Sequence, residues 1–221
     1  SVRCADVDRI CVFMGAADGN DEAYVEMAEA LGTLIGKAGK TLVYGGATVG
    51  LMGRVAAACI AAGGQVIGVA PHSITAIEGE TFADGTRLED VATVYRVRSM
   101  ERRKAQMMDL ADGYVVLPGG GGTFAEAWPV LDTSKLQRAG MHAGDRKPVV
   151  FLAPDDFFDG TMQQIRKSVE KGFMKDDFND LFRIARSPEE ALMRLEGFEA
   201  RFGRGRRVGV PSTEVGPPTA T

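Results

Sequence analysis

The chain has 221 residues, of which 45% are hydrophobic and 25% are charged, so it can bury a sizeable core and lacks the composition of a disordered protein. Its formal net charge is -4, which argues against a protein that coats nucleic acid or an anionic membrane. A small anionic ligand would therefore need a local site.

Short apolar runs, each followed by glycine or proline, predict buried strands along the chain. They cover residues 10–14, 41–44, 66–70, 114–117 and 149–152. After the first run, Tyr24, Ala28, Leu31 and Ile35 recur at helical spacing, and the alanine-rich segment 50–63 predicts a second helix. Because the runs are apolar throughout, their strands should be covered on both faces. We predict an α/β fold: Rossmann-like, doubly wound, with a mostly parallel sheet and helices on both faces.

The rest of the chain gives weaker signals. Segment 71–98 fits neither period and suggests an excursion before a helix that begins near Ser99. A final helix is predicted over 188–202. Residues 204–221 are rich in Gly, Pro and Arg and predict a flexible tail, so that residues 1–203 form a single domain.

Cysteine and histidine usage bears on the compartment and on metals. Cys4, Cys11 and Cys59 lack CxxC spacing, which argues against a disulfide framework and a zinc knuckle. No apolar run approaches membrane-spanning length, and the start of the chain lacks the features of a secretory signal. His72 and His142 lack the spacing of metal ligands. We expect a cytosolic protein without a metal.

The strongest local signal is the glycine run LPGGGGT, from Leu117 to Thr123, between a predicted strand and a predicted helix. Glycines let the backbone approach a ligand, and the N–H groups of the following helix turn attract an anion. A plain turn needs only one or two glycines, so four in succession favour phosphate binding. Neither this loop nor GGATVGLMG has GxGxxG spacing, and GTLIGKA is one residue short of a P-loop, which disfavours a dinucleotide dehydrogenase and an NTPase.

Glu126 has two interpretations. Thr123 and Glu126 have the spacing of a capping box, in which the carboxylate only returns a hydrogen bond to the helix N-terminus, and the residues alone favour this interpretation. A carboxylate on the first turn after a phosphate loop also reaches the sugar that the phosphate carries. There it could stabilise a cationic transition state or activate water.

Arg103 lies on the apolar side of a predicted helix. Ser99 is a suitable N-cap, and Arg103 shares a helical face with Met100 and Met107, which we interpret as core filling. A solvated or snorkelling side chain explains most arginines on helices and suits Arg102 well, but it suits Arg103 less. A guanidinium aimed at a phosphate or a leaving group is the sharper interpretation.

These motifs resemble those of the LOG family, cytokinin-activating nucleoside 5′-monophosphate phosphoribohydrolases often labelled "possible lysine decarboxylase". PGGGGTFAE, from Pro118 to Glu126, matches the family's PGGxGTxxE motif in full. The segment MERRK matches its MHERK-type motif in part, with Glu101 and Arg102 at the usual His and acidic positions. YGGATVGLMG and VFMGAADG resemble two further motifs, and the resemblance covers about residues 9–175.

The resemblance implies the activity and the site. A LOG-type enzyme hydrolyses the N-glycosidic bond of an adenine-type nucleoside 5′-monophosphate, AMP or its N6-prenylated form, to free base and ribose 5-phosphate. It uses no metal or organic cofactor and works as a homodimer or larger assembly, in which helices of neighbouring subunits complete the site. By this similarity Arg103 and Glu126 form the catalytic pair. The residues expected to bind the substrate are Gly15, Gly45, Gly46, Met100, Lys104, Gly119, Gly120, Gly121, Gly122, Thr123 and Thr133.

The chain also departs from the family pattern. Ala16 and Ala17 replace serines of the opening loop, Lys135 stands where Gln is usual, and the loop after Glu126 is longer. These differences keep a second hypothesis open, a nucleotide- or cofactor-binding protein that hydrolyses nothing. A third, the literal decarboxylase, would need pyridoxal phosphate on a lysine, and no lysine here has a Ser-x-His-Lys setting.

Overall fold

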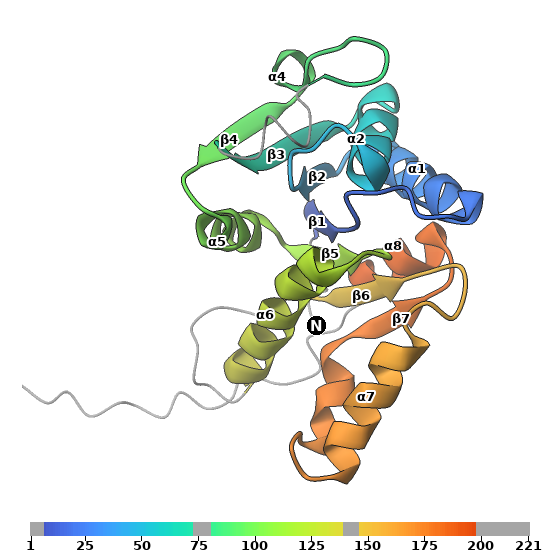
Figure 1. Ribbon diagram of the computed structural model, residues 1–221, viewed down its shortest axis with the longest axis vertical. Helices are drawn as coiled ribbons and strands as arrows, with labels where there is room; N and C mark the ends of the chain where they lie inside the picture. The colour runs from blue at the N-terminus through green and yellow to red at the C-terminus, as the bar shows by residue number, and fades with distance from the viewer. Residues whose placement is uncertain (1–6, 73–80, 139–145, 198–221) are drawn as a thin grey trace, which may run out of the picture.

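The computed structural model describes residues 7–72, 81–138 and 146–197, which form a parallel α/β sheet structure (Figure 1). Within these ranges seven strands, all paired in parallel, follow the order β4-β3-β2-β1-β5-β6-β7. The strands are β1 (Arg9–Phe13), β2 (Thr41–Tyr44), β3 (Gln65–Pro71), β4 (Thr93–Val97), β5 (Gly113–Val116), β6 (Val149–Leu152) and β7 (Arg183–Ala185). All five predicted strands are present.

Helices connect the strands. They are α1 (Glu22–Lys37), α2 (Gly50–Ala61), α4 (Leu88–Val91), α5 (Met100–Leu110), α6 (Gly121–Arg138), α7 (Asp159–Glu170), the 3-10 helix η1 (Asp176–Leu181) and α8 (Pro188–Glu196). Local capping fixes several starts: the Asp21 side chain accepts a hydrogen bond from the N–H of Ala23 at α1, and Ser99 accepts one from Arg102 at α5. In the described ranges no helix combines the length and apolarity needed to cross a membrane.

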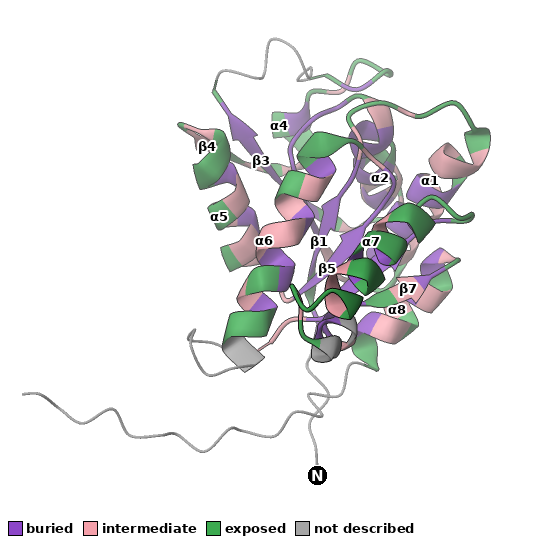
Figure 2. Ribbon diagram, turned by 60° about the horizontal axis from the view of Figure 1, so that its bottom comes forward, coloured by how far each residue is buried: buried purple, intermediate pink, exposed green. Residues whose placement is uncertain are grey.

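The sheet is covered on both faces, which confirms the doubly wound prediction. Ile10 and Val12 of β1 join a core with α1, α2 and α8, whereas Cys11 and Phe13 join a second core with α5, α6 and α7. This alternation follows from the two-residue period of a strand. Figure 1 shows α1 and α2 on one side of the sheet and α5 and α6 on the other, and Figure 2 shows buried strands between helices whose outer faces are exposed.

The direction of the strand connections reverses next to β1. From β1 the chain moves outward through β2, β3 and β4, then returns to β5 on the other side of β1 and continues outward through β6 and β7. At such a reversal the loops at the carboxyl ends of the two central strands diverge, and ligands of open α/β sheets bind there. The loops after β1 and β5 are those that carry VFMGAADG and the glycine run.

Two predictions need correction. Segment 71–98 contains the edge strand β4, which was missed because TVYRV mixes polar and apolar residues and all of its side chains are at least partly exposed. The last helix ends at Glu196, before Gly197, and not at residue 202, because glycine favours a helix end. Residues 198–202 and the predicted tail 204–221 lie outside the described residues.

Candidate active site

The loops after β1 and β5 are joined by their backbones. The Gly15 N–H donates a hydrogen bond to the Pro118 carbonyl over 3.0 Å. A Cβ atom on Gly119 would overlap Thr123 Oγ1 and would lie 2.7 Å from the Gly15 nitrogen. Gly119 therefore has no side chain because two neighbouring segments fill the space around it. This packing holds the first glycine of the run in a fixed position against the loop after β1.

The next three glycines of the run have the opposite surroundings. A Cβ atom on Gly120, Gly121 or Gly122 would meet no atom within 4 Å, and all three residues are exposed. Helix α6 begins at Gly121, so the first N–H groups of the helix lie at this open surface. Such groups have no acceptor within their own helix, and the helix dipole adds positive potential. The arrangement suits an anion such as a phosphate.

The helix boundary contradicts the capping-box interpretation of Glu126. Thr123 is the third residue of α6 and is 3% exposed, so it is not the N-cap that a capping box requires. The helix starts earlier than predicted because Gly121 and Gly122 are themselves helical. Glu126 therefore lies in the second turn of α6, and the spacing of Thr123 and Glu126 does not describe a cap.

Arg103 of α5 and Glu126 of α6 form a buried ion pair. Arg103 Nη1 lies 3.9 Å from Glu126 Oε1, and the two side chains are only 5% and 11% exposed. Arg103 Nε donates to the Val69 carbonyl at 3.1 Å, and Nη2 donates to the Gly45 carbonyl at 2.9 Å. The expectation that Arg103 lies on the apolar side of its helix is confirmed. A buried guanidinium is tolerated here because backbone carbonyls and a carboxylate surround it.

Cys11 is a potential nucleophile close to this pair. Burial, and then the negative charge of Glu126, raise the pKa of the Cys11 thiol well above its usual range. The thiol therefore stays neutral, and a neutral thiol is a poor nucleophile. The charge in this cluster therefore comes from Arg103 and Glu126.

The other predicted site residues lie at different distances from the pair. Met100 is 36% exposed and so does not fill the core as expected, although its sulfur lies 3.8 Å from Arg103 Nη1. Lys104 is half-buried. Gly46 has a φ of 81°, and a Cβ atom there would lie 3.0 Å from Ala70 Cβ, so it fits a tight backbone packing position. Thr133 is seven residues beyond Glu126 on α6, about 10 Å along the helix, and the structure does not bring it to the glycine run.

Two contacts of Arg103 were not found from the sequence. The Val69 carbonyl belongs to the backbone of β3, and the Met52 sulfur of α2 lies 3.8 Å from Arg103 Nη2. A carbonyl group is present in every residue, so sequence gives no signal for the first. The GLMG match was the only available signal for the second.

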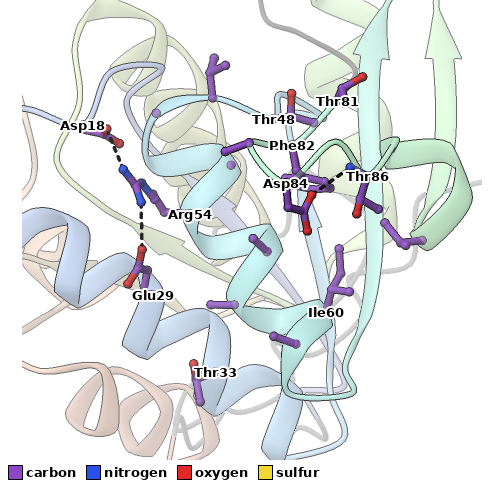
Figure 3. A pocket seen from close by; sticks show the side chains of 18 residues that line it. Asp18, Glu29, Thr33, Thr48, Arg54, Ile60, Thr81, Phe82, Asp84 and Thr86 are labelled. Atoms are coloured by element: carbon purple, nitrogen blue, oxygen red, sulfur yellow. Dashed lines mark hydrogen bonds and ion pairs between the residues drawn. The ribbon is translucent and has the colours of Figure 1, made fainter.

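A cavity of about 880 Å³ lies elsewhere, beside α2 and the segment around Phe82 (Figure 3). Arg54 faces it and pairs with Asp18 at 3.5 Å and Glu29 at 3.3 Å. Neither Arg103 nor the glycine run lines this cavity. Among residues 7–72, 81–138 and 146–197, no group of three His, Cys, Asp or Glu side chains could hold a metal ion.

Comparison with known proteins gives a consistent result. Residues 52–195 match a family described as possible lysine decarboxylase. The chain is 36% identical over 208 residues to the cytokinin riboside 5′-monophosphate phosphoribohydrolase LOG of Oryza sativa subsp. japonica, covering 94% of this chain and 76% of that protein. It is 36% identical over 196 residues to an Arabidopsis thaliana protein of the same activity name, covering 88% and 83%.

Solved structures share the fold. The molybdenum cofactor binding protein of Rippkaea orientalis superimposes with a TM-score of 0.56 at 26% identity, over 84% of this chain and 93% of that one. The Moco carrier protein of Chlamydomonas reinhardtii gives a TM-score of 0.55 at 23% identity, over 84% and 93%. The second likeness shows the fold alone.

Proposed function

The chain belongs to the LOG family, whose model is described as possible lysine decarboxylase, and from this premise we propose that it is a nucleoside 5′-monophosphate phosphoribohydrolase. It hydrolyses the N-glycosidic bond of an adenine-type nucleotide, AMP or N6-prenylated AMP, to free base and ribose 5-phosphate. The observation that carries the proposal is the buried Arg103–Glu126 pair at 3.9 Å beside the open start of α6.

The substrate's position follows from the helix. The 5′-phosphate binds the first N–H groups of α6, at Gly121 and Gly122, where the helix dipole favours negative charge. Glu126 is four residues beyond Gly122, about 6 Å along the axis, which is the size of one ribose unit. The phosphate thus brings the anomeric carbon against the carboxylate.

The chemistry uses this carboxylate. As the bond from C1′ to the base nitrogen breaks, its electron pair leaves with the base and C1′ gains oxocarbenium character. The negative charge of Glu126 stabilises that cation. Water attacks C1′ and gives a proton to Glu126, which passes it to the departing base. Arg103, held by two backbone carbonyls, keeps the carboxylate in place and orients the nucleotide.

The decisive test is Glu126→Ala. Base release from AMP or N6-prenylated AMP, followed by chromatography, is expected to fall by about 100-fold to 10,000-fold, the usual contribution of a positioned acid–base group. Glu29→Ala removes a carboxylate that pairs with Arg54 in the cavity of Figure 3 and serves as the matched control. Undiminished turnover in a correctly folded Glu126→Ala variant would exclude the proposed mechanism.

One observation favours a second candidate, a non-hydrolytic binding protein: the fold is shared with a molybdenum cofactor binding protein at 26% identity. The LOG relatives are more similar, at 36%, so we rank hydrolysis first. Calorimetric binding of AMP, with no adenine formed on prolonged incubation, would reverse this ranking. A chromophore in the pyridoxal absorption band would support the literal decarboxylase instead.

The finer parts of the proposal are the base, the assembly and the compartment. A panel of nucleoside monophosphates will identify the preferred base. We propose a homodimer or larger assembly, as the resemblance to the LOG family implies; light scattering tests it. The buried, unpaired thiols of Cys11 and Cys59 are compatible with the reducing cytosol.

A further inference from the structure

We infer that Gly45 is a positioning residue whose missing side chain makes the space that holds the Arg103 guanidinium in reach of Glu126. The inference rests on the proposed function and assigns a specific task to a residue of the YGGATVGLMG segment. Gly45 follows directly after β2, at the same edge of the sheet as the glycine run.

The space beside Gly45 is filled by the guanidinium. A Cβ atom built on Gly45 would overlap Arg103 Nη2 and would lie 2.8 Å from Arg103 Cζ and 3.0 Å from Met52 Sδ. The Gly45 carbonyl accepts the hydrogen bond from Nη2 at 2.9 Å. One residue thus provides both the acceptor and the volume for the same nitrogen, and any side chain at this position competes with Arg103 for its site.

Backbone conformation does not explain this glycine. Gly46, the next residue, has a φ of 81°, which disfavours other residues. Gly45 is not among the described glycines with positive φ. Alanine is therefore allowed by the backbone at residue 45, and its cost comes from the contacts of the new methyl group, chiefly with the Arg103 guanidinium and also with Met52 Sδ at 3.0 Å. The two adjacent glycines are therefore required for different reasons. Gly46 is required by its backbone conformation, and Gly45 by the side chains that contact it.

The guanidinium is held from several directions. Nε donates to the Val69 carbonyl on β3, and Nη2 donates to the Gly45 carbonyl after β2, so the ends of two neighbouring strands fix the plane of the group. This plane aims Nη1 at Glu126, 3.9 Å away. Displacing Nη2 from Gly45 rotates or withdraws the whole planar group, because its nitrogens are rigidly connected.

A displaced guanidinium should affect turnover more than folding. The atom that an alanine would meet is the far end of a flexible side chain, which can move but then gives up its hydrogen bond to the Gly45 carbonyl. The geometry between Arg103 and Glu126 cannot be kept when it moves, and a misplacement of about 1 Å in an active site can reduce turnover by about 100-fold. If Gly45 had only a packing role, its substitution would reduce stability more than turnover.

The test measures kcat, KM and melting temperature for Gly45→Ala. We expect kcat for AMP to fall by about 100-fold, while the melting temperature falls by about 2–12 °C. Gly160→Ala is the matched control, because a Cβ atom there meets no atom within 4 Å and its φ is not positive. It should keep wild-type kcat.

The double variant Gly45→Ala/Arg103→Ala supplies the specific readout. If the alanine acts through the guanidinium, it lowers kcat no further in the Arg103→Ala background, and it lowers the melting temperature less there than in the wild-type background. Equal losses in both backgrounds, or wild-type kcat in Gly45→Ala, would overturn the inference. The melting temperatures do not depend on hydrolysis: a wild-type protein that releases no base refutes the proposed function, whereas base release with additive losses refutes only the role of Gly45.

Discussion

Two arginines show how differently this molecule uses charge in two regions. Arg103 and Arg54 each lie within 4 Å of a glutamate, at 3.9 Å from Glu126 and 3.3 Å from Glu29. The Arg103 side chain is 5% exposed and the Arg54 side chain 48%. The cavity of about 880 Å³ lies beside Arg54 and not beside Arg103. The proposed catalytic pair is therefore distinguished by the burial of a compensated charge and not by the size of a neighbouring cavity.

The physical reason is the cost of removing ions from water. An exposed pair such as Arg54–Glu29 is well solvated with or without its partner, so it contributes about 0.2–1 kcal/mol. A buried pair must be compensated by its surroundings or it destabilises the fold. The two carbonyls that accept from Arg103 supply this compensation. A buried ion pair of this kind, near the carboxyl ends of the strands, is more easily explained by a role in function than by a gain in stability.

The largest expected effect on stability is that of Arg103→Ala. This variant removes the ion pair of Arg103 with the buried Glu126 carboxylate and the donor to two carbonyls, which costs about 3 kcal/mol or more. Base release should fall by at least about 100-fold. Urea unfolding gives the free energy of unfolding, and chromatography gives turnover. If the Arg103→Ala variant is as stable and as active as the wild type, the buried Arg103 pair is no more important than the exposed Arg54 pair.

The glycine run contains the same contrast between packed and open positions. Gly119→Ala should cost about 1–3 kcal/mol, because the new methyl group collides with Thr123 and the Gly15 backbone. Gly121→Ala should leave stability unchanged or raise it, since alanine is the better helix former and the space is open. It should instead weaken AMP binding, measured by calorimetry, if the phosphate occupies that space. Equal effects of the two substitutions on stability would contradict this division of roles.

The sequence was sufficient for the parts of the fold that depend on local apolar pattern. The five central strands are continuous apolar runs because helices cover both of their faces. β4 was missed because an edge strand with exposed residues such as Tyr95, at 41%, has no such run, and β7 has only three residues. The outer strands form because they pair with a neighbouring strand, and the pattern of a single sequence does not show that pairing.

The site could be predicted from the sequence where a motif residue also lies in the site of the folded structure. Arg103 and Glu126 were identified and are close in space, whereas the capping box failed because glycines were not expected to open α6. Thr133, assigned to the substrate site by resemblance, lies seven residues beyond Glu126 on α6, and its contact with the substrate stays a prediction. The role inferred for Gly45 was out of reach, because it depends on which side chain from a helix 58 residues away fills its empty volume.

Removing the other arginine should have little effect. Arg54→Ala loses two exposed ion pairs, with Asp18 and Glu29, so its free energy of unfolding should fall by about 1 kcal/mol at most, and less at high salt. Turnover of AMP should equal that of the wild type. A loss of turnover comparable to that of Arg103→Ala would show that the cavity beside α2 takes part in the reaction.

The smallest expected effect tests whether that cavity is used at all. Thr48 lines it, is 7% exposed, and its hydroxyl oxygen has no hydrogen-bond partner in the structure. Thr48→Val replaces this hydroxyl by a methyl group of similar size, so stability should stay constant or rise by about 1 kcal/mol. Thermal unfolding measures the change. A clear decrease would mean that the hydroxyl has a partner in solution, either an ordered water or a bound ligand. The cavity would then resemble the Arg103–Glu126 region, because both would contain a buried polar group that needs a partner.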